Sequence, residues 1–174
     1  MDGILSGERI YLKRLSVDDV TETYVGWLND PEINRYLECR FQKHTVEETK
    51  SFIESISNDS NYQFGIYYKE NDRHIGNIKI GNINHRHKYA DLGFLIGEKD
   101  YWGKGIASEA IYLATDFAFD YLQLNKLWGG VYAPNIGSMK AFEKNGYKVE
   151  GHYIKQYLIN GAYVDAFIYA KRNE

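Results

Sequence analysis

Residues 92–110 read LGFLIGEKDYWGKGIASEA, and this stretch decides how the rest of the chain is interpreted. It predicts a buried strand, a loop with two glycines and then a helix. Gly103 and Gly105 flank Lys104 at the turn from strand to helix, and glycines allow a backbone to approach a ligand closely. The N-terminus of the helix directs free N–H groups into the loop, which favours an anion such as phosphate. We therefore predict a backbone cradle for a pyrophosphate; a simple packed corner is the alternative.

Length and composition fit one soluble domain spanning residues 1–174, with room for a sizeable core. The net charge of −3 argues against nucleic acid as the main partner. Cys39 is the only cysteine, which excludes an internal disulfide, and no Cys/His cluster has the spacing of a zinc site. The sequence contains no basic leader with an apolar run and no stretch long enough to cross a membrane. We expect a cytoplasmic protein that binds neither a membrane nor a metal.

Strand and helix patterns extend outward from the quoted stretch on both sides. Alternating apolar and polar residues predict strands at 9–15, 62–69, 74–80, 89–96, 126–132, 147–157 and 163–170. Helical spacing predicts helices that begin near Ser16, Thr45, Gly105 and Asn135. Short loops imply antiparallel pairing, and helical crossovers force parallel pairing only at the centre. The predicted class is α+β (mixed α/β), a mostly antiparallel mixed sheet that is splayed at its centre, with helices on both faces.

Four motifs in order resemble the GNAT superfamily of N-acetyltransferases. The family's coenzyme A motif, (Gln/Arg)-x-x-Gly-x-(Gly/Ala), matches residues 102–107, where Gly105 and Ala107 fit and Trp102 departs. The run 101–110 resembles the branch that acetylates ribosomal-protein N-termini and its amino-sugar relatives. The other matching runs are 125–127, 133–138 with 142–147, and 150–151. The resemblance covers residues 9–169 and implies a GNAT-like fold and acetyl-coenzyme A as the acetyl donor.

The resemblance assigns a set of residues to coenzyme A. The amides of Lys104, Gly105, Ile106, Ala107 and Ser108 would hold its pyrophosphate, in agreement with the argument from the helix N-terminus. The backbone of Leu95, Ile96 and Gly97 would pair with the pantetheine arm as an added strand does. Asn135 would lie beside the arm, Ser138 near the thiol and Lys144 near the adenine-side phosphates. Asn135 would equally serve as a helix cap, and Lys144 as a solvated lysine.

Acetyl transfer needs an amine that has lost its proton, and the free amine has a pKa of about 10. The thioester oxygen also needs a hydrogen-bond donor as it becomes anionic. Many family members carry a tyrosine acid at the position of Phe142, which has no proton to give. We predict Ser138 as the replacement donor and Asp91 as the base, directly or through water, with Glu150 a weaker candidate. Asp91 would otherwise pair with His85, His87 or Lys88.

The acceptor side is predicted to be aromatic and basic. Residues 29–36 match the family's acceptor-side loop, and the predicted acceptor-binding residues are Trp27, Arg35, Tyr36, His85 and His87. Aromatic faces stack on a base or sugar, and arginine suits phosphate. This loop, together with residues 83–88, resembles members that acetylate nucleotide-linked amino sugars, so such a sugar is our hypothesis. A protein N-terminus is the alternative, followed by a polyamine or an antibiotic; polyamines fit poorly because a polycation favours an acidic mouth.

Three further interpretations stay open at this point. Gly103-x-Gly105-x-x-Ser108 nearly spells a dinucleotide-binding motif, but it lies mid-chain after antiparallel strands and lacks a well-placed acid. Phe142 keeps open a GNAT-like module that binds an acyl-coenzyme A without turnover. The tyrosines of the last two strands, Tyr153, Tyr157, Tyr163 and Tyr169, suggest a homodimer, since exposed aromatic strands often mark interfaces.

Overall fold

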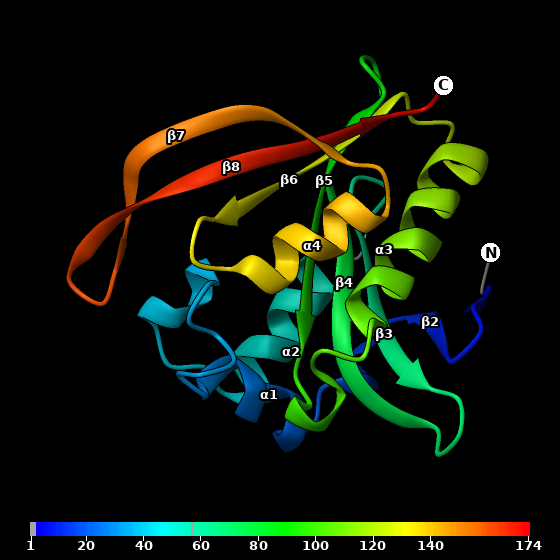
Figure 1. Ribbon diagram of the computed structural model, residues 1–174. Helices are drawn as coiled ribbons and strands as arrows, with labels where there is room; N and C mark the ends of the chain where they lie inside the picture. The colour runs from blue at the N-terminus through cyan, green and yellow to red at the C-terminus, as the bar shows by residue number, and fades with distance from the viewer. Residues whose placement is uncertain (1–2, 57) are drawn as a thin grey trace.

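The computed structural model describes residues 3–56 and 58–174, which build one eight-stranded sheet with helices on both faces (Figure 1). The strands are β1 (Leu5–Ser6), β2 (Ile10–Arg14), β3 (Tyr62–Tyr68), β4 (Arg73–Asn84), β5 (Tyr89–Ile96), β6 (Lys126–Tyr132), β7 (Lys148–Ile159) and β8 (Ala162–Arg172). The α-helices are α1 (Glu22–Asn29), α2 (Val46–Ser55), α3 (Ile106–Asp116) and α4 (Ile136–Lys144). The strand order is β1-β2-β3-β4-β5-β6-β8-β7. The predicted fold class is confirmed.

The sheet opens between its two central strands. β5 and β6 are the one parallel pair among the named strands, and they pair only from Tyr89 opposite Lys126 to Asp91 opposite Trp128. Beyond that point β5 stays paired with β4 as far as Ile96, and β6 stays paired with β8 as far as Tyr132. The two halves of the sheet therefore diverge from a fork at Asp91, as the sequence predicted.

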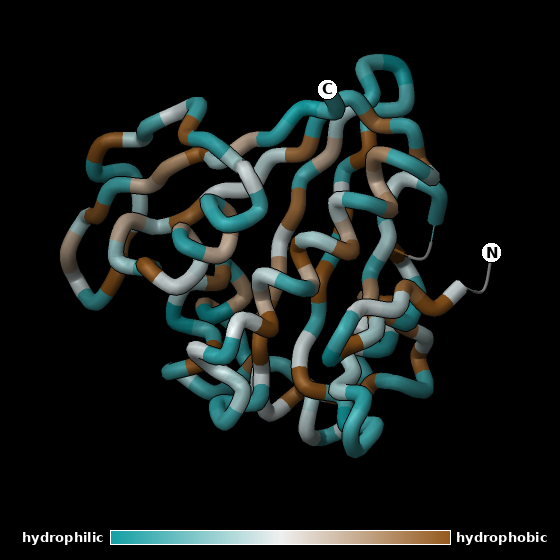
Figure 2. The backbone as a smooth tube through the Cα atoms, turned by 45° about the vertical axis from the view of Figure 1, so that its right-hand side comes forward, coloured by the Kyte–Doolittle hydropathy of each residue, from teal (hydrophilic) through white to brown (hydrophobic). Residues whose placement is uncertain are grey.

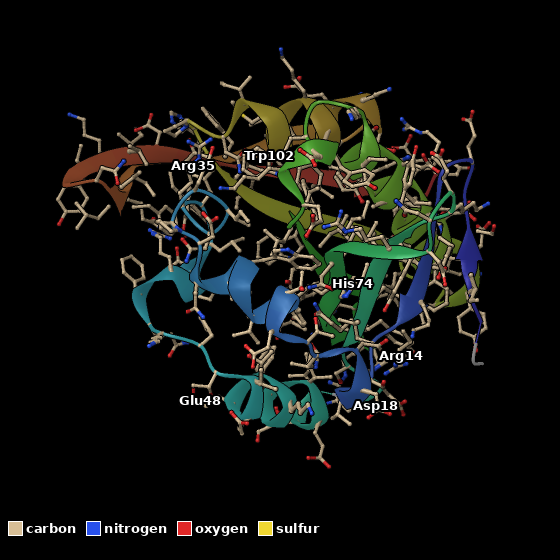
Figure 3. All side chains as sticks on the ribbon, turned by 90° about the horizontal axis from the view of Figure 1, so that it is seen from below. Arg14, Asp18, Arg35, Glu48, His74 and Trp102 are labelled. Atoms are coloured by element: carbon tan, nitrogen blue, oxygen red, sulfur yellow. The ribbon has the colours of Figure 1, made fainter. Side chains whose placement is uncertain are left out.

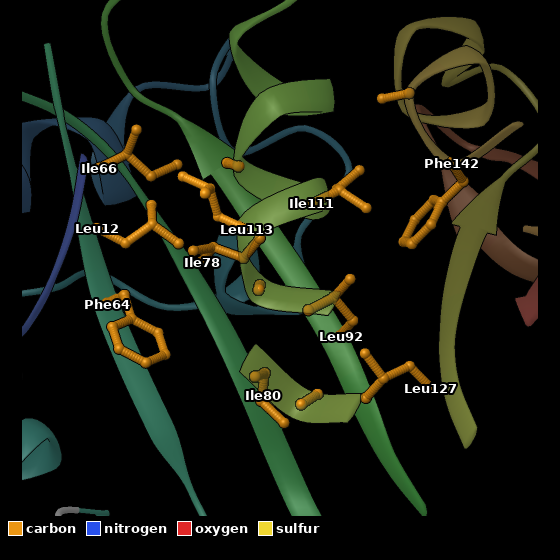
Figure 4. Packing of buried hydrophobic residues seen from close by; sticks show 14 of the residues in the cluster. Leu12, Phe64, Ile66, Ile78, Ile80, Leu92, Ile111, Leu113, Leu127 and Phe142 are labelled. Carbon is orange, nitrogen blue, oxygen red and sulfur yellow. The ribbon is translucent and has the colours of Figure 1, made fainter. Parts of the chain in front are cut away.

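The larger core lies between the sheet and the helices α3 and α4, which stand in front of it in Figure 1. Ile111 of α3 is fully buried near Ile78, Ile80 and Leu92 of the central strands (Figure 4). Phe142 of α4 completes this layer and is 2% exposed. Figure 2 shows the hydrophobic residues concentrated along these inner elements and the polar residues on the outer loops. Packing of this apolar face fixes where α3 begins, and therefore where its N-terminus points.

A smaller core covers part of the opposite face of the sheet. It contains Tyr24, Val25 and Trp27 of α1 and Ile53 of α2, together with Leu15 and Val20. Among the described residues, no helix is long and apolar enough to span a membrane.

Three local details differ from the sequence prediction. Ser16 and Asp19 do form the predicted capping box, but it opens only a 3₁₀ turn, η1 (Val17–Asp19). Val20 is extended, so α1 starts later, where the Thr21 hydroxyl accepts the Tyr24 amide at 3.2 Å. The helix predicted to begin near Gly105 does not stay regular: after Asp116 it continues as a π turn, η4 (Phe117–Tyr121).

Candidate active site

A cleft of about 570 Å³ opens where β5 and β6 diverge. Four segments line it: the loop after α1 (32–37), the end of β5 (94–96), the loop and first turn of α3 (101–108) and α4 with the residues before it (134–144). Arg35 on one wall and Trp102 on another both face this cleft (Figure 3). The segments are the ones that the sequence analysis assigned to the donor and to the acceptor loop.

The glycine loop presents unpaired amides to the cleft. Gly103 and Gly105 have φ values of 71° and 78°, in the left-handed region that favours glycine. The first hydrogen bond of α3 runs from the Glu109 amide to the Gly105 carbonyl at 3.1 Å. Within the described chain, the amides from Gly103 to Ser108 donate no hydrogen bond. A row of free donors at the positive end of a helix dipole fits a pyrophosphate.

Fewer residues than predicted have free backbone groups at the open edge of β5. The Gly97 amide donates to Ile75 of β4 at 2.9 Å, and backbone groups alternate along a strand, so those of Leu95 face β4 too. The backbone N–H and C=O groups of Phe94 and Ile96 therefore face the gap toward β6. The Ile96 carbonyl accepts the indole N–H of Trp102 at 2.8 Å. Of the predicted residues Leu95, Ile96 and Gly97, only Ile96 offers its backbone to a ligand in the gap. Phe94, which was not predicted, offers its backbone there as well.

The start of α4 forms the facing wall of the cleft. Asn135 caps the helix by accepting the Ser138 amide at 3.2 Å, as predicted for a cap, and it also lines the cleft. The Ser138 hydroxyl lines the cleft and has no hydrogen-bond partner among residues 3–56 and 58–174. Lys144, in the last turn of α4, is exposed at the same wall. The side chain of Lys104 instead extends over the Tyr101 ring, so only its amide can serve the cradle.

The acceptor wall carries an uncompensated arginine. The guanidinium of Arg35 lies 4.8 Å from the centre of the Tyr36 ring, and the Tyr36 hydroxyl donates to the Pro134 carbonyl at 3.3 Å. Glu32 and Asp30, the acids of this loop, both pair with Lys99, at 2.6 and 2.9 Å. Arg35 itself takes part in no ion pair in the described part of the chain, so its guanidinium is available to an acceptor.

Trp27 is not an acceptor-binding residue, which corrects the prediction. It is 4% exposed, and its indole donates to Glu98 at 3.1 Å. A Cβ on Gly97 would lie 2.0 Å from the Trp27 ring, so the tryptophan supports the end of β5 from beneath. His74 packs against Trp27 in an edge-to-face arrangement, with the two ring centroids 5.0 Å apart. Burial lowers the pKa of this histidine.

His85 and His87 are also not brought to the cleft. Both are exposed on the hairpin before β5, whereas the cleft lies at the far end of that strand, about 20 Å along it.

Asp91 marks the fork but does not line the cleft. Its carboxylate is bound by Lys79 at 3.1 Å and by Asn82 at 2.6 Å, rather than by the histidines or Lys88. A role as base would therefore require an intervening water.

Phe142 and Cys39 both lack a chemical role in this geometry. The Phe142 ring points into the fork, where its Cζ would lie 2.6 Å from a Cβ on Gly129, so it contributes packing rather than a proton. Cys39 lies in the 3₁₀ turn η2 (Glu38–Phe41) and does not line the cleft. Burial raises the pKa of its thiol, which disfavours the nucleophilic thiolate.

Comparisons with known proteins agree with this architecture. A family model described as acetyltransferase (GNAT) domain matches residues 9–148. A probable N-acetyltransferase of Bacillus subtilis, YjcK, is 33% identical over 98% of this chain and 97% of its own length. The spermidine N(1)-acetyltransferase of Escherichia coli is 30% identical over 92% of this chain and 84% of its own. A spermidine N-acetyltransferase of Vibrio cholerae, solved with CoA and spermine, superimposes with a TM-score of 0.85 at 24% identity, covering 95% of this chain and 96% of its own.

Proposed function

The chain belongs to the acetyltransferase (GNAT) family, and we propose that it transfers the acetyl group of acetyl-coenzyme A directly to a primary amine in a ternary complex. The observation that carries this proposal is the row of unpaired amides at the start of α3, beside the open edge of β5. Together they offer a phosphate site and a strand edge in one cleft.

Each wall of the cleft has a proposed task. Acetyl-coenzyme A supplies the acetyl group as a reactive thioester. The amides of Lys104 to Ser108 bind the pyrophosphate, Lys144 adds positive charge, and Ile96 with Phe94 offers backbone groups to the pantetheine arm. Ser138 donates a hydrogen bond from its hydroxyl to the thioester oxygen or to the departing sulfur and keeps its proton, and Asn135 orients Ser138 through the cap. Asp91, held by Lys79, takes the amine proton through water.

The free guanidinium of Arg35 favours an acceptor that carries negative charge. Asp30 and Glu32 share Lys99, and Glu98 is paired with Arg73, so Arg35 has no acid of its own. Arg35 beside Tyr36 offers a cation and an aromatic face, which suit a phosphate next to a base or a sugar. We therefore propose a nucleotide-linked amino sugar as the acceptor.

Spermidine is the second candidate, because the E. coli relative that acetylates it is 30% identical over most of this chain. A polycation would need carboxylates, and here it would share Asp30 and Glu32 with Lys99. A protein N-terminus is the third candidate and has no specific observation in its favour.

A free-thiol release assay separates these acceptors. UDP- and dTDP-linked 4-amino sugars, spermidine and N-terminal peptides are tested with acetyl-coenzyme A. We expect turnover on the nucleotide sugars, and Arg35→Ala should raise their KM about tenfold, as expected for one charge-assisted contact. Arg86→Ala, on the exposed hairpin far from the cleft, is the matched control. Turnover on spermidine alone would identify the polyamine, not the nucleotide sugar, as the acceptor. Tight binding of acetyl-coenzyme A with no transfer to any amine would favour a non-catalytic module.

A further inference from the structure

One arginine outside the cleft contacts the backbone of the glycine loop. Arg9, just before β2, donates from Nη1 to the Lys104 carbonyl at 2.6 Å. Its Nε donates to Glu109 of α3 at 3.0 Å. The guanidinium therefore joins the glycine loop to the first turn of the helix, across almost 100 residues of sequence.

Glu109 holds that arginine in place. One of its carboxylate oxygens accepts the backbone amides of Arg9 and Ile10 at 2.8 and 3.2 Å, and the other accepts Arg9 Nε. The Glu109 side chain is only 12% exposed, whereas Arg9 is 39% exposed, so the carboxylate end of these charge-assisted bonds is shielded from water. The start of β2, the start of α3 and the loop form one fixed unit.

The contact with Lys104 determines where the next amide points. In a trans peptide the C=O and the N–H point in opposite directions, and the described chain contains no cis peptide. Because the Lys104 carbonyl is directed at Arg9, the Gly105 N–H is directed away from Arg9. Gly105 lines the cleft, and a Cβ placed on it would meet Arg9 Nη2 at 3.4 Å, so the arginine lies behind the loop.

We propose that Arg9 is a positioning residue that holds the Lys104–Gly105 peptide with its N–H toward the pyrophosphate of the acetyl donor. This proposal rests on the proposed use of acetyl-coenzyme A. Arg9 acts through the loop and does not touch the reacting atoms. Its loss would leave the peptide free to turn, which weakens binding of the pyrophosphate while the thioester end of the cleft is unchanged.

The test compares two acetyl donors, acetyl-coenzyme A and S-acetylpantetheine, which lacks the pyrophosphate. We expect Arg9→Met to raise KM for acetyl-coenzyme A about tenfold with kcat within twofold of the wild type. For S-acetylpantetheine, kcat/KM should stay within twofold. Arg9→Lys keeps a charge for Glu109 but loses the planar fork, and should show the same selective effect at an unchanged melting temperature.

Arg14→Met is the matched control, because Arg14 lies at the other end of β2 and also donates to backbone carbonyls, those of Asn58 and Asn61. Arg14→Met should leave KM for acetyl-coenzyme A and kcat/KM for S-acetylpantetheine unchanged. An unchanged KM for acetyl-coenzyme A in folded Arg9 variants would overturn the proposal, and so would an equal loss for both donors, since that marks a merely structural arginine. Failure of the wild-type protein to bind coenzyme A is a separate result that overturns the proposed function instead.

Discussion

At the scale of single residues, Ser138 is the proposed hydrogen-bond donor to the reacting atoms. Ser138 lines the cleft next to the capping Asn135, and Phe142 cannot supply the proton that a tyrosine would. Ser138→Ala should lower kcat on the order of 10- to 100-fold, with KM for acetyl-coenzyme A within twofold, since only the reaction step loses a donor. Steady-state kinetics check this, with Ser51→Ala on the exposed side of α2 as the control. An unchanged kcat would show that the thiolate leaves without help.

Asp19 provides a test of stability against pH. Burial alone would raise its pKa, but hydrogen bonds from Lys13, Ser16 and Tyr67 outweigh burial and lower the pKa to about 2. A lowered folded-state pKa gives stability that is present above about pH 4 and is lost as the pH falls through about 2. Asp19→Asn should therefore reduce the free energy of unfolding by about 2 kcal/mol at pH 7, and the difference should shrink below about pH 4.

Urea unfolding across that pH range measures the effect. Asp18→Asn changes the same charge in the same turn at an exposed position and serves as the control. A destabilisation by Asp19→Asn that stays constant from pH 7 to pH 3 would contradict the ion-pair origin.

Local chemistry was readable from the sequence and long-range chemistry was not. The glycine loop, the Asn135 cap and the Ser16–Asp19 capping box each depend on residues a few positions apart, which a pattern can show. Arg9 and Glu109 lie 100 residues apart, so no local spacing pointed to them. Trp27 was misassigned because the sequence pattern of an aromatic residue on a helix is the same whether its side chain faces a ligand or the core.

At the scale of elements, the fork between β5 and β6 requires glycine on β6. A Cβ on Gly129 would lie 2.8 Å from the Leu92 carbonyl of β5, which is backbone and cannot move aside easily. Gly129→Ala should therefore destabilise the protein by about 1–3 kcal/mol, as overpacking does. Gly130→Ala is the matched control, because its Cβ would meet only Ile168 at an ordinary 3.7 Å. Equal melting temperatures for the two variants would contradict the close approach at the fork.

The elements themselves were predicted well and their ends less well. The bounds of β5 and β6 match, because buried apolar runs between turns are a strong signal. The start of α1 was missed because Val20 carries the helical spacing yet is extended, and Thr21 offers a competing cap. The histidines of the β4–β5 hairpin were placed at the cleft because the sequence does not say which end of a strand meets a pocket.

At the scale of the whole molecule, the last hairpin is where we predict self-association. Tyr153 and Tyr163 are 41% and 65% exposed on β7 and β8, and Ile154 is 73% exposed beside them. Tyr169, in contrast, is 3% exposed and belongs to the core, which corrects its assignment to this surface. Light scattering should give the mass of a dimer for the wild type and of a monomer for Ile154→Glu. A monomeric wild type at working concentration would contradict the prediction.

The central claim is that the amides at the start of α3 bind the acetyl donor, and isothermal titration calorimetry with acetyl-coenzyme A tests it most directly. The wild type should bind, and Gly105→Tyr should abolish binding, because its Cβ would meet Arg9 Nη2 at 3.4 Å and a φ of 78° is strained for tyrosine, so the loop that presents the amides must move. Gly161→Tyr is the control, since Gly161 also has a positive φ, of 80°, at a hairpin turn with open space around it. Binding is expected for the wild type and Gly161→Tyr but not for Gly105→Tyr. Undiminished binding by a folded Gly105→Tyr, or none by the wild type, would contradict it.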